Sequence, residues 1–355
     1  MTSRLFRAGH ARLRALVAVA AVAACALPGT AHAAVTPLSA QTQNLYLGAD
    51  LTPAVQATTL PQFFAAANQI WSAVKASDPP TRMQKIADSI AAAQPDVVAL
   101  QEVAKWTAVG GGEPSFDFLA LLQQALTARG LNYSVASTSE NATFGPFPLP
   151  SPFSPSFSLT FHDRDVILVK NRPGLAFSTP QNGHFATQLS LPLPAPLPPA
   201  TFTRGWASID GVVGGRSFHF VDTHLETEAA PPVQVAQANE LLAGPLSGSG
   251  TVLAAGDFNS AADGSTTQTY SLLTQSFSDA WINGNQQSPG FSCCQAADLL
   301  NKLSQLHERI DLVLTKNASR TPAPKAKVVN DRQVDRTATG QWPSDHAGVA
   351  ATVFP

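Results

Sequence analysis

The chain has 355 residues, of which 22 are basic and 24 are acidic, and 44% of its residues are hydrophobic. This balance is typical of a globular protein and lacks the strong positive charge that attracts nucleic acid from a distance. Beyond the N-terminal segment, no apolar run is long enough to cross a bilayer, which excludes a protein with several membrane-spanning helices.

The N-terminal segment has the three-part pattern of a secretory signal peptide. Arginines at positions 4, 7, 12 and 14 precede an apolar run at residues 15–27, and Ala31-His32-Ala33 supplies the small residues of a cleavage site. The apolar run is too short for a stable membrane span. We therefore expect a signal peptide over residues 1–33, cleavage near Ala33, and a secreted or periplasmic protein. An uncleaved N-terminal anchor is the alternative.

Loss of this leader would shift the charge balance. The leader holds four arginines and no acid, so 18 basic residues would remain against 24 acidic ones, a net charge of −6. An acidic surface does not attract polyanions from a distance, so electrostatic capture of nucleic acid is not indicated. Bound divalent cations and a local basic patch could still override this average.

Short apolar runs alternate with helical patterns over residues 34–355, which we expect to form one domain. Buried strands are predicted at residues 96–100, 166–169, 218–221, 251–255 and 310–314. Helices are predicted at residues 83–93, 116–129 and 233–242, where apolar side chains recur at helical spacing. This alternation predicts an α/β fold in which helices cover the sheets.

Two stretches interrupt the alternation, at residues 144–157 and 191–202. Both are rich in Pro, Phe and Leu and contain no charged residue. Proline at this density is incompatible with central strands and helix interiors, so we expect loops or edge segments. They either fold back over a sheet edge or form an apolar lip that faces a substrate or a lipid surface.

Acids, amides and histidines stand next to several of the predicted strands. The relevant segments are Gln101-Glu102, Asp222-Thr223-His224, Gly256-Asp257-Phe258-Asn259, Asp311 within its strand, and Ser344-Asp345-His346 before the last strand. Ligands of α/β proteins gather at the carboxyl ends of strands. We therefore expect these side chains to converge on one pocket.

This set of side chains suits hydrolysis of a phosphoester. Carboxylate and amide oxygens are hard ligands for Mg²⁺, Mn²⁺ or Ca²⁺, and a bound cation neutralises phosphate charge and helps to activate water. An acid can orient or deprotonate that water, and a histidine can donate to the phosphoryl oxygen or the leaving group. The sequence contains neither a Gly-x-Ser-x-Gly elbow nor a Walker phosphate loop.

Five blocks, taken in order, resemble those of the endonuclease/exonuclease/phosphatase superfamily. They are Thr42-Gln43-Asn44-Leu45, Gln94-Pro95-Asp96 with Leu100-Gln101-Glu102, Thr223-His224-Leu225, Gly256-Asp257-Phe258-Asn259, and Ser344-Asp345-His346. Members include pancreatic-type deoxyribonucleases, apurinic endonucleases, bacterial sphingomyelinases and inositol-polyphosphate 5-phosphatases. The resemblance implies a four-layer sandwich of two packed mixed β-sheets flanked by helices, and a hydrolase that depends on Mg²⁺, Mn²⁺ or Ca²⁺.

The resemblance also implies which residues bind the metal and activate water. Glu102 would be the principal metal ligand, with Asn44 beside it. Asp345 would be a further ligand or a carboxylate that supports one. Asp257 would position or activate the attacking water, and Asn259 would hold the phosphate or Asp257.

The remaining roles concern the phosphate. His346 would contact the scissile phosphate, with Asp311 orienting its imidazole. His224 would stabilise the phosphate or protonate the leaving oxygen, although the neighbouring Asp222 could pair with it structurally. Arg164, which matches the family more loosely, is either a phosphate contact or a salt-bridge partner of an adjacent acid.

Two adjacent cysteines, Cys293 and Cys294, remain once Cys25 leaves with the leader. Export favours oxidation, so the pair could form a strained vicinal disulfide; two free buried thiols are the alternative. No further ligands stand at the spacing of a zinc site, so we interpret the pair as structural.

The phosphoester itself is less well indicated. Export, the acidic chain and the two apolar stretches favour a lipid headgroup, as for sphingomyelinases, with peripheral contact to a membrane. The alternative is an extracellular nuclease, but few Tyr, Lys or Arg residues are grouped to hold a nucleic-acid backbone. A phosphomonoesterase and a binding protein without catalysis are further alternatives, since fold alone does not specify substrate.

Overall fold

The computed structural model describes residues 36–149, 156–284 and 287–355. The expected signal peptide lies outside the described residues, as does the centre of the first proline-rich stretch. Within the described ranges, no helix is both long enough and apolar enough to span a membrane.

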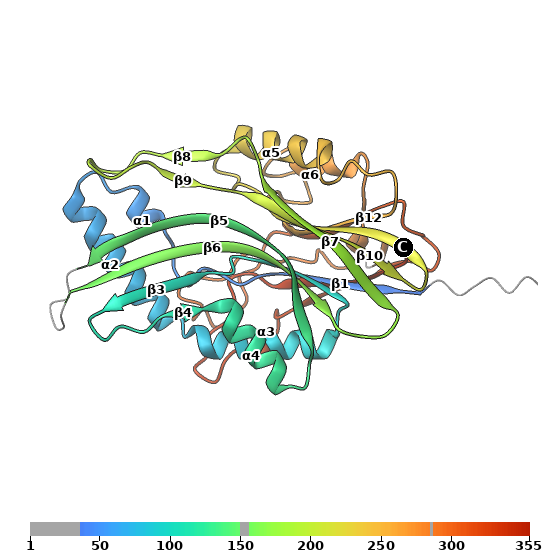
Figure 1. Ribbon diagram of the computed structural model, residues 1–355, viewed down its shortest axis with the longest axis horizontal. Helices are drawn as coiled ribbons and strands as arrows, with labels where there is room; N and C mark the ends of the chain where they lie inside the picture. Colours follow the sequence, from blue (N-terminus) through green and yellow to red (C-terminus); the bar gives the residue numbers. More distant parts are fainter. Residues whose placement is uncertain (1–35, 150–155, 285–286) are drawn as a thin grey trace, which may run out of the picture. The chain divides into compact units, whose positions relative to one another are not determined.

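Two large β-sheets form the centre of the fold (Figure 1). In spatial order the first sheet contains β15 (Lys325–Val329), β16 (Gly348–Val353), β1 (Leu38–Asn44), β2 (Val97–Gln101), β6 (Phe157–Lys170), β3 (Lys105–Gly110) and β4 (Phe116–Asp117), with β5 (Tyr133–Leu149) also paired to β6. The second contains β13 (Ser278–Asp279), β14 (Asp311–Lys316), β12 (Val252–Asp257), β11 (Arg216–His224), β10 (Gly205–Val213) and β7 (Leu175–His184). A small separate sheet pairs β8 (Leu189–Leu191) with β9 (Ala200–Phe202). Both large sheets are mixed, because β1–β2 and β11–β12 are parallel pairs among antiparallel ones.

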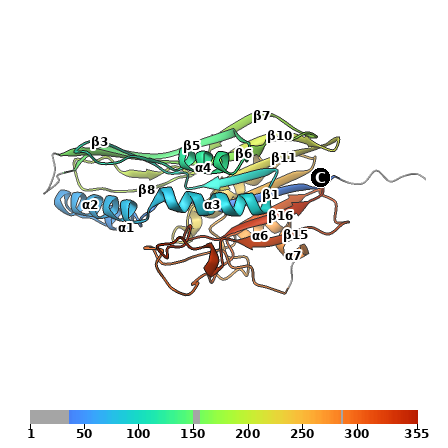
Figure 2. The same ribbon diagram turned by 90° about the horizontal axis from the view of Figure 1, so that it is seen from below.

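Helices cover the outer faces of the two large sheets. The first sheet is covered by α2 (Leu60–Ala76), α3 (Pro79–Ala93) and α4 (Phe118–Ala128), with the short α1 (Thr52–Val55) beside α2. The second is covered by α5 (Pro231–Ala243) and α6 (Thr269–Thr274). Figure 1 shows α5 and α6 on one side of the sheets and α3 and α4 on the other, and Figure 2 shows α2 and α3 following one another along the first sheet. Two short elements, α7 (Ala280–Gly284) and the 3₁₀ helix η1 (Gln333–Asp335), complete the fold.

The core explains why β2 consists of consecutive apolar residues. Successive strand residues point to opposite faces. Val97 and Ala99 therefore pack between the sheets, in a cluster that includes Phe220 of β11, while Val98 and Leu100 pack under the helices. Burial of each such side chain contributes about 1–3 kcal/mol. The four-layer α/β sandwich expected from the sequence is thereby confirmed.

The predicted elements are present, with shifted ends. The runs at residues 166–169 and 218–221 are the buried parts of the longer strands β6 and β11. The first proline-rich stretch enters β5, which pairs with β6 and is interrupted by irregularities in register near Phe144. The second runs between β8 and β9. The sequence analysis missed α2, although Phe63, Ile70 and Val74 recur at helical spacing on its buried face.

Candidate active site

The sheet registers bring the polar strand ends to one edge. In the first sheet, Asn44 at the end of β1 is opposite Gln101, and Glu102 follows directly. In the second sheet, the parallel β11–β12 pair places His224 opposite Asp257, and the antiparallel β14 places Asp311 opposite Asp257 on the other side. Asp311 thus reaches the same edge from the start of its strand, because β14 runs in the opposite direction.

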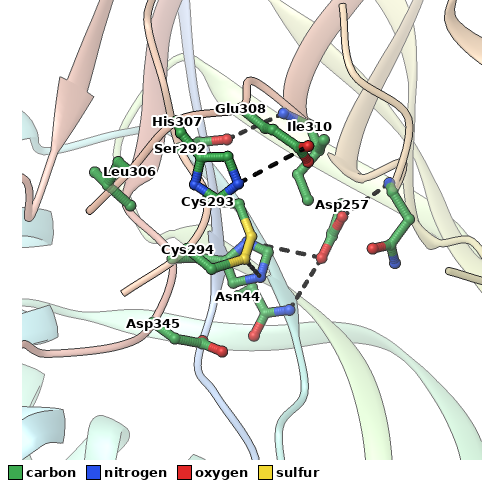
Figure 3. The surroundings of a disulfide bond; sticks show 12 residues. Asn44, Asp257, Ser292, Cys293, Cys294, Leu306, His307, Glu308, Ile310 and Asp345 are labelled. Carbon is green, nitrogen blue, oxygen red and sulfur yellow. Dashed lines mark hydrogen bonds and ion pairs between the residues drawn. A yellow bond between two sulfur atoms is a disulfide. The ribbon is translucent and has the colours of Figure 1, made fainter. Parts of the chain in front are cut away.

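A hydrogen bond joins the two sheets at this edge. Asn44 Nδ2 donates to Asp257 Oδ2 at 3.1 Å (Figure 3). The other carboxylate oxygen of Asp257 accepts from the backbone N–H of Asn259 at 2.9 Å. The side chain of Asn259 donates instead to the Leu225 carbonyl at 2.9 Å. Asn259 therefore holds Asp257 through its backbone, and its amide fastens the loop after β11.

Two imidazoles flank the same carboxylate. His346 Nδ1 lies 2.9 Å from Asp311 Oδ2 and 3.8 Å from Asp257 Oδ2. His224 Nε2 lies 3.5 Å from Asp257 Oδ2. The bond to Asp311 fixes a proton on Nδ1 of His346 and leaves Nε2 as the nitrogen that can meet a substrate.

The two histidines differ in protonation state. Burial lowers the pKa of His346, but the charges of Asp311 and Asp257 and the hydrogen bond to Asp311 outweigh burial and raise the pKa well above its usual value. Burial, Arg204 and His346 together lower the pKa of His224 well below its usual value. Burial also raises the pKa of Asp257 to about 6, although His346 opposes this effect. At neutral pH the site therefore holds a cationic donor, a neutral imidazole and a carboxylate.

Glu102 and Asp345 form the acidic side of the site. Both are half-buried, and Glu102 Oε2 accepts from the Leu47 N–H at 2.7 Å. Burial, with the charge of Asp345, raises the pKa of Glu102 to about 8, and burial also raises the pKa of Asp345. The charge of Asp345 disfavours a charged Glu102, an effect that a bound cation would offset, and the oxygens of Glu102, Asp345 and Asn44 are the hard donors that Mg²⁺, Mn²⁺ and Ca²⁺ prefer. The residues present thus fit a divalent cation.

The backbone turns sharply at the site. Tyr46, Glu102 and Asn259 are non-glycine residues with positive φ, at 58°, 53° and 50°. Each follows the end of a strand that carries site residues. Such conformations cost about 1–3 kcal/mol and persist where the surroundings enforce them. Here the turns redirect the chain so that polar side chains at the strand ends face the same space.

Arg82 holds two loops of the site in place, and its role was not predicted from the sequence. This fully buried residue of α3 donates to the carbonyls of Leu45 at 2.8 Å and Pro343 at 3.0 Å. It thereby ties the loop after β1 to the loop before β16. Burial lowers the pKa of Arg82 to about 10, so it stays charged at neutral pH. The signal for it was a lone cation beside Met83 on the apolar face of a helix.

Arg204 is the second residue that the sequence analysis missed. Its Nη1 lies 2.7 Å from His224 Nδ1, and its Nη2 lies 3.9 Å from Glu226 Oε1. Arg204, and not Asp222, is therefore the partner of His224; Asp222 instead accepts from Gln101 at 2.6 Å. A guanidinium cannot accept a hydrogen bond, so it donates to the ring of the neutral His224, whose Nδ1 and Nε2 lie 2.7 Å and 3.2 Å from Nη1.

Arg164 forms a salt bridge, which is the second of the two roles considered for it from the sequence. Its guanidinium donates to Asp117 Oδ1 at 2.7 Å and to the Val103 carbonyl at 3.0 Å. The neighbours Asp163 and Asp165 point to the opposite face of β6, where both face Asn141. The structural alternative of the sequence analysis, a salt bridge, holds for Arg164, but with Asp117 rather than with the adjacent acids.

A cleft opens above the acidic side of the site. Glu102, Asp163, Arg204 and Asp345 line it. An apolar pocket adjoins this cleft, and the side chains of Leu51, Val55, Phe161 and Phe202 line both. Among the described residues, the pocket is lined by apolar side chains, namely Leu51, Ala54, Val55, Phe63, Ala67, Ile70, Trp106, Phe144, Phe147, Leu159, Phe161, Leu193, Ala200 and Phe202. The first proline-rich stretch contributes Phe144 and Phe147 to this lining, and the second contributes Leu193, Ala200 and Phe202.

Solved structures share this fold at low sequence identity. An endonuclease/exonuclease/phosphatase family protein from Leptotrichia buccalis C-1013-b is 14% identical, with a TM-score of 0.56 over 89% of this chain and 99% of its own. Truncated Caenorhabditis elegans TDP2 is 16% identical, with a TM-score of 0.51 over 90% and 98%. D. rerio TDP2, described as complexed with single strand DNA product, is 14% identical, with a TM-score of 0.52 over 90% and 99%. No curated protein matches the chain.

A family model provides the sequence-level match. The model of the Endonuclease/Exonuclease/phosphatase family matches residues 62–346, which is most of the chain. The match spans Glu102, His224, Asp257, Asp311 and His346. Proteins of this family are typically metal-dependent phosphoesterases, in accord with the acids and histidines gathered here. This chain belongs to the endonuclease/exonuclease/phosphatase family.

Proposed function

We propose that the chain is an exported phosphodiesterase, dependent on Mg²⁺ or a similar divalent cation, that cleaves the phosphoester of a lipid headgroup in the manner of a sphingomyelinase. The observation that carries this proposal is that an apolar pocket adjoins the acidic cleft, with Phe161 and Phe202 in the walls of both. Export is supported by the signal-peptide pattern of residues 1–33.

The cation would be held by Glu102, Asp345 and Asn44. When bound, it would neutralise charge on the phosphate and help to lower the pKa of an attacking water. Asp257, held between Asn44 and the backbone of Asn259, would orient that water and accept its proton. Two fixed hydrogen bonds to Asp257 keep its carboxylate from rotating away from the water.

The histidines and Arg204 would act on the phosphate. His346, oriented by Asp311, would donate from Nε2 to a phosphoryl oxygen. His224 is neutral, so it would stabilise the phosphate as a hydrogen-bond donor and not deliver a full proton to the leaving oxygen. Arg204 adds a positive charge to the cleft wall.

The apolar pocket would receive the hydrocarbon part of the substrate. Phe202 stands at its junction with the cleft, and its ring contacts Phe144 edge-on at 5.3 Å between centroids. Burying an aliphatic chain against such side chains contributes roughly 0.8 kcal/mol per methylene. A nucleic acid has no group of this kind to place there, which is why we favour a lipid substrate.

Substitution of Phe202 tests the lipid assignment. Phe202→Asp should lower kcat/KM on sphingomyelin vesicles by about tenfold or more while leaving hydrolysis of the soluble bis-p-nitrophenyl phosphate near its normal rate. Val334→Asp, at a position that is 70% exposed on η1, is the matched control and should change neither rate. Equal effects of Phe202→Asp on both substrates would argue against a lipid-binding pocket.

The alternative is an extracellular nuclease. One protein with this fold, D. rerio TDP2, is described as complexed with single strand DNA product. Plasmid and single-stranded DNA should therefore be incubated with the protein and Mg²⁺ beside the vesicles. Cleavage of DNA without cleavage of lipid would replace our proposal with the nuclease. Activity on none of these substrates with any common divalent cation would favour a binding protein.

A further inference from the structure

Cys293 and Cys294 form a vicinal disulfide beside the active site (Figure 3). The Sγ atom of Cys294 lies 3.9 Å from Nε2 of His346, the imidazole nitrogen opposite the one that Asp311 holds. Cys293 is buried and Cys294 is half-buried, so a small reagent can reach the pair from solvent. The reaction proposed above uses neither sulfur.

The backbone around the two cysteines is fixed by bonds that do not involve sulfur. The Gln295 N–H donates to the Asp345 carbonyl at 2.8 Å, and the Ala347 N–H donates to the Ser292 carbonyl at 2.8 Å. Ser292 Oγ also accepts from the Asp311 N–H at 3.1 Å. These bonds hold the segment against His346 on both sides, so reduction of the disulfide would leave both sulfurs next to the imidazole.

The sulfurs and the imidazole form a donor set unlike that of Glu102 and Asp345. One ligand atom from each of Cys293, Cys294 and His346 lies within 4.8 Å of the other two. Thiolate sulfur and imidazole nitrogen suit Zn²⁺ and other soft cations, whereas Mg²⁺ prefers oxygen. A cation held by all three would form bonds of about 2.3 Å to sulfur and about 2.0 Å to nitrogen, for which the two sulfurs must move apart once their bond is broken.

We propose that Cys293, Cys294 and His346, once the disulfide is reduced, bind a soft divalent cation such as Zn²⁺ or Cd²⁺, and that this cation inhibits the enzyme. An external dithiol supplies two electrons and two protons to the sulfur–sulfur bond and becomes a cyclic disulfide, which leaves two thiols. The cation then displaces both thiol protons and the proton on His346 Nε2. The cation thereby coordinates Nε2 of His346, the nitrogen that would otherwise donate to the phosphate.

Cadmium titration tests this site without relying on activity. The oxidised protein and the protein reduced with a dithiol, desalted in the absence of oxygen, are titrated with Cd²⁺ in the presence of Mg²⁺. We expect the thiolate-to-cadmium charge-transfer absorption to appear in the reduced protein alone and to saturate at one cation per chain. Hydrolysis of bis-p-nitrophenyl phosphate should fall in proportion to this occupancy and return after chelation of Cd²⁺ and addition of Mg²⁺.

Two variants distinguish this sulfur–nitrogen site from the proposed cation site at Glu102 and Asp345. Cys293→Ser with Cys294→Ser should abolish the absorption and the inhibition that depends on reduction. If the double variant does not fold, Cys294→Ser alone, which removes one sulfur and the disulfide, should weaken the absorption and the inhibition and make both independent of reduction. His346→Asn should keep both thiolates yet lower cadmium affinity by at least about tenfold. Unchanged affinity in His346→Asn, equal absorption in oxidised and reduced protein, or a disulfide that resists reduction in the folded protein would overturn the proposal.

Discussion

The polar site and the apolar pocket lie on two sides of one cleft, which Glu102 and Asp345 line together with Phe161 and Phe202, yet they are built in different ways. The polar site (Asn44, Glu102, His224, Asp257, Asp311, Asp345 and His346) consists of residues at the ends of strands and in the loops beside them, and hydrogen bonds such as Asn44–Asp257 connect the two sheets. The apolar pocket is formed by α1, α2 and the segments around β5, β6 and β9. The catalytic groups thus come from the strand ends where the two sheets meet, whereas substrate choice would depend on a pocket whose lining includes Ile70, Trp106 and Phe161 of the hydrophobic core.

The sharpest test of this division is Asp257→Asn. The change removes the proton acceptor while keeping the size of the side chain, so kcat should fall by about 10²–10⁴-fold on every substrate. The unfolding temperature should not fall, because a buried charge has been removed. Asp210→Asn, an exposed acid on β10 that pairs with His219, is the control and should leave kcat unchanged. Near-normal activity in Asp257→Asn would contradict the catalytic role proposed for Asp257.

A smaller effect is expected from Asp311→Asn, which acts through His346. Loss of the carboxylate should lower kcat by roughly 10²-fold, because the imidazole is less well oriented and less often protonated. Since Asp311 raises the pKa of His346, the basic limb of the pH profile of kcat/KM should move to lower pH in the variant. A uniform loss with no shift of that limb would indicate that Asp311 is merely structural.

The two arginines offer a direct contrast between function and structure. Arg204→Ala should reduce kcat/KM by about tenfold or more, because it removes charge from the cleft wall. Arg164→Ala should leave kcat/KM near normal but lower the free energy of unfolding by about 1–3 kcal/mol, because Asp117 loses a partner. Activity assays and denaturant unfolding of both variants measure these two quantities. A loss of kcat/KM in Arg164→Ala but not in Arg204→Ala would favour Arg164 as the phosphate contact.

The smallest expected effect is the pH dependence of stability without metal. The pKa of Glu102 is raised to about 8, and that of Asp257 and Asp163 to about 6, so the folded state holds these protons more tightly than the unfolded chain. Stability from this source is complete below about pH 4 and is lost as pH rises toward about 8. His224, with its lowered pKa, opposes this trend as pH rises toward its usual value.

Thermal unfolding in a chelator from about pH 5 to pH 8 measures this trend. The unfolding temperature should fall as pH rises, and Mg²⁺ should raise it most at the alkaline end, where the acids are charged. Glu102→Gln should flatten the profile and weaken the effect of Mg²⁺. Identical profiles with and without Mg²⁺ would contradict a cation site at Glu102.

The sequence by itself determined the layered α/β plan and the polar strand ends. Runs such as residues 251–255 show their burial locally, and Asp257 follows directly, so neither inference needed a distant contact. The family blocks supplied the order of the site residues. The pairing of His346 with Asp311 was also expected from the resemblance, and the structure places the two side chains 2.9 Å apart.

Only the tertiary structure decided which charged groups face the site and what adjoins it. Arg164 and Arg204 are alike as residues, but alternation along β6 turns one toward Asp117, whereas contacts across the second sheet bring the other to His224. The apolar pocket, the carbonyls held by Arg82 and the contact of Cys294 with His346 join segments far apart in the chain. Local periodicity predicts whether a side chain is buried, but sheet register and packing determine which residue that side chain contacts.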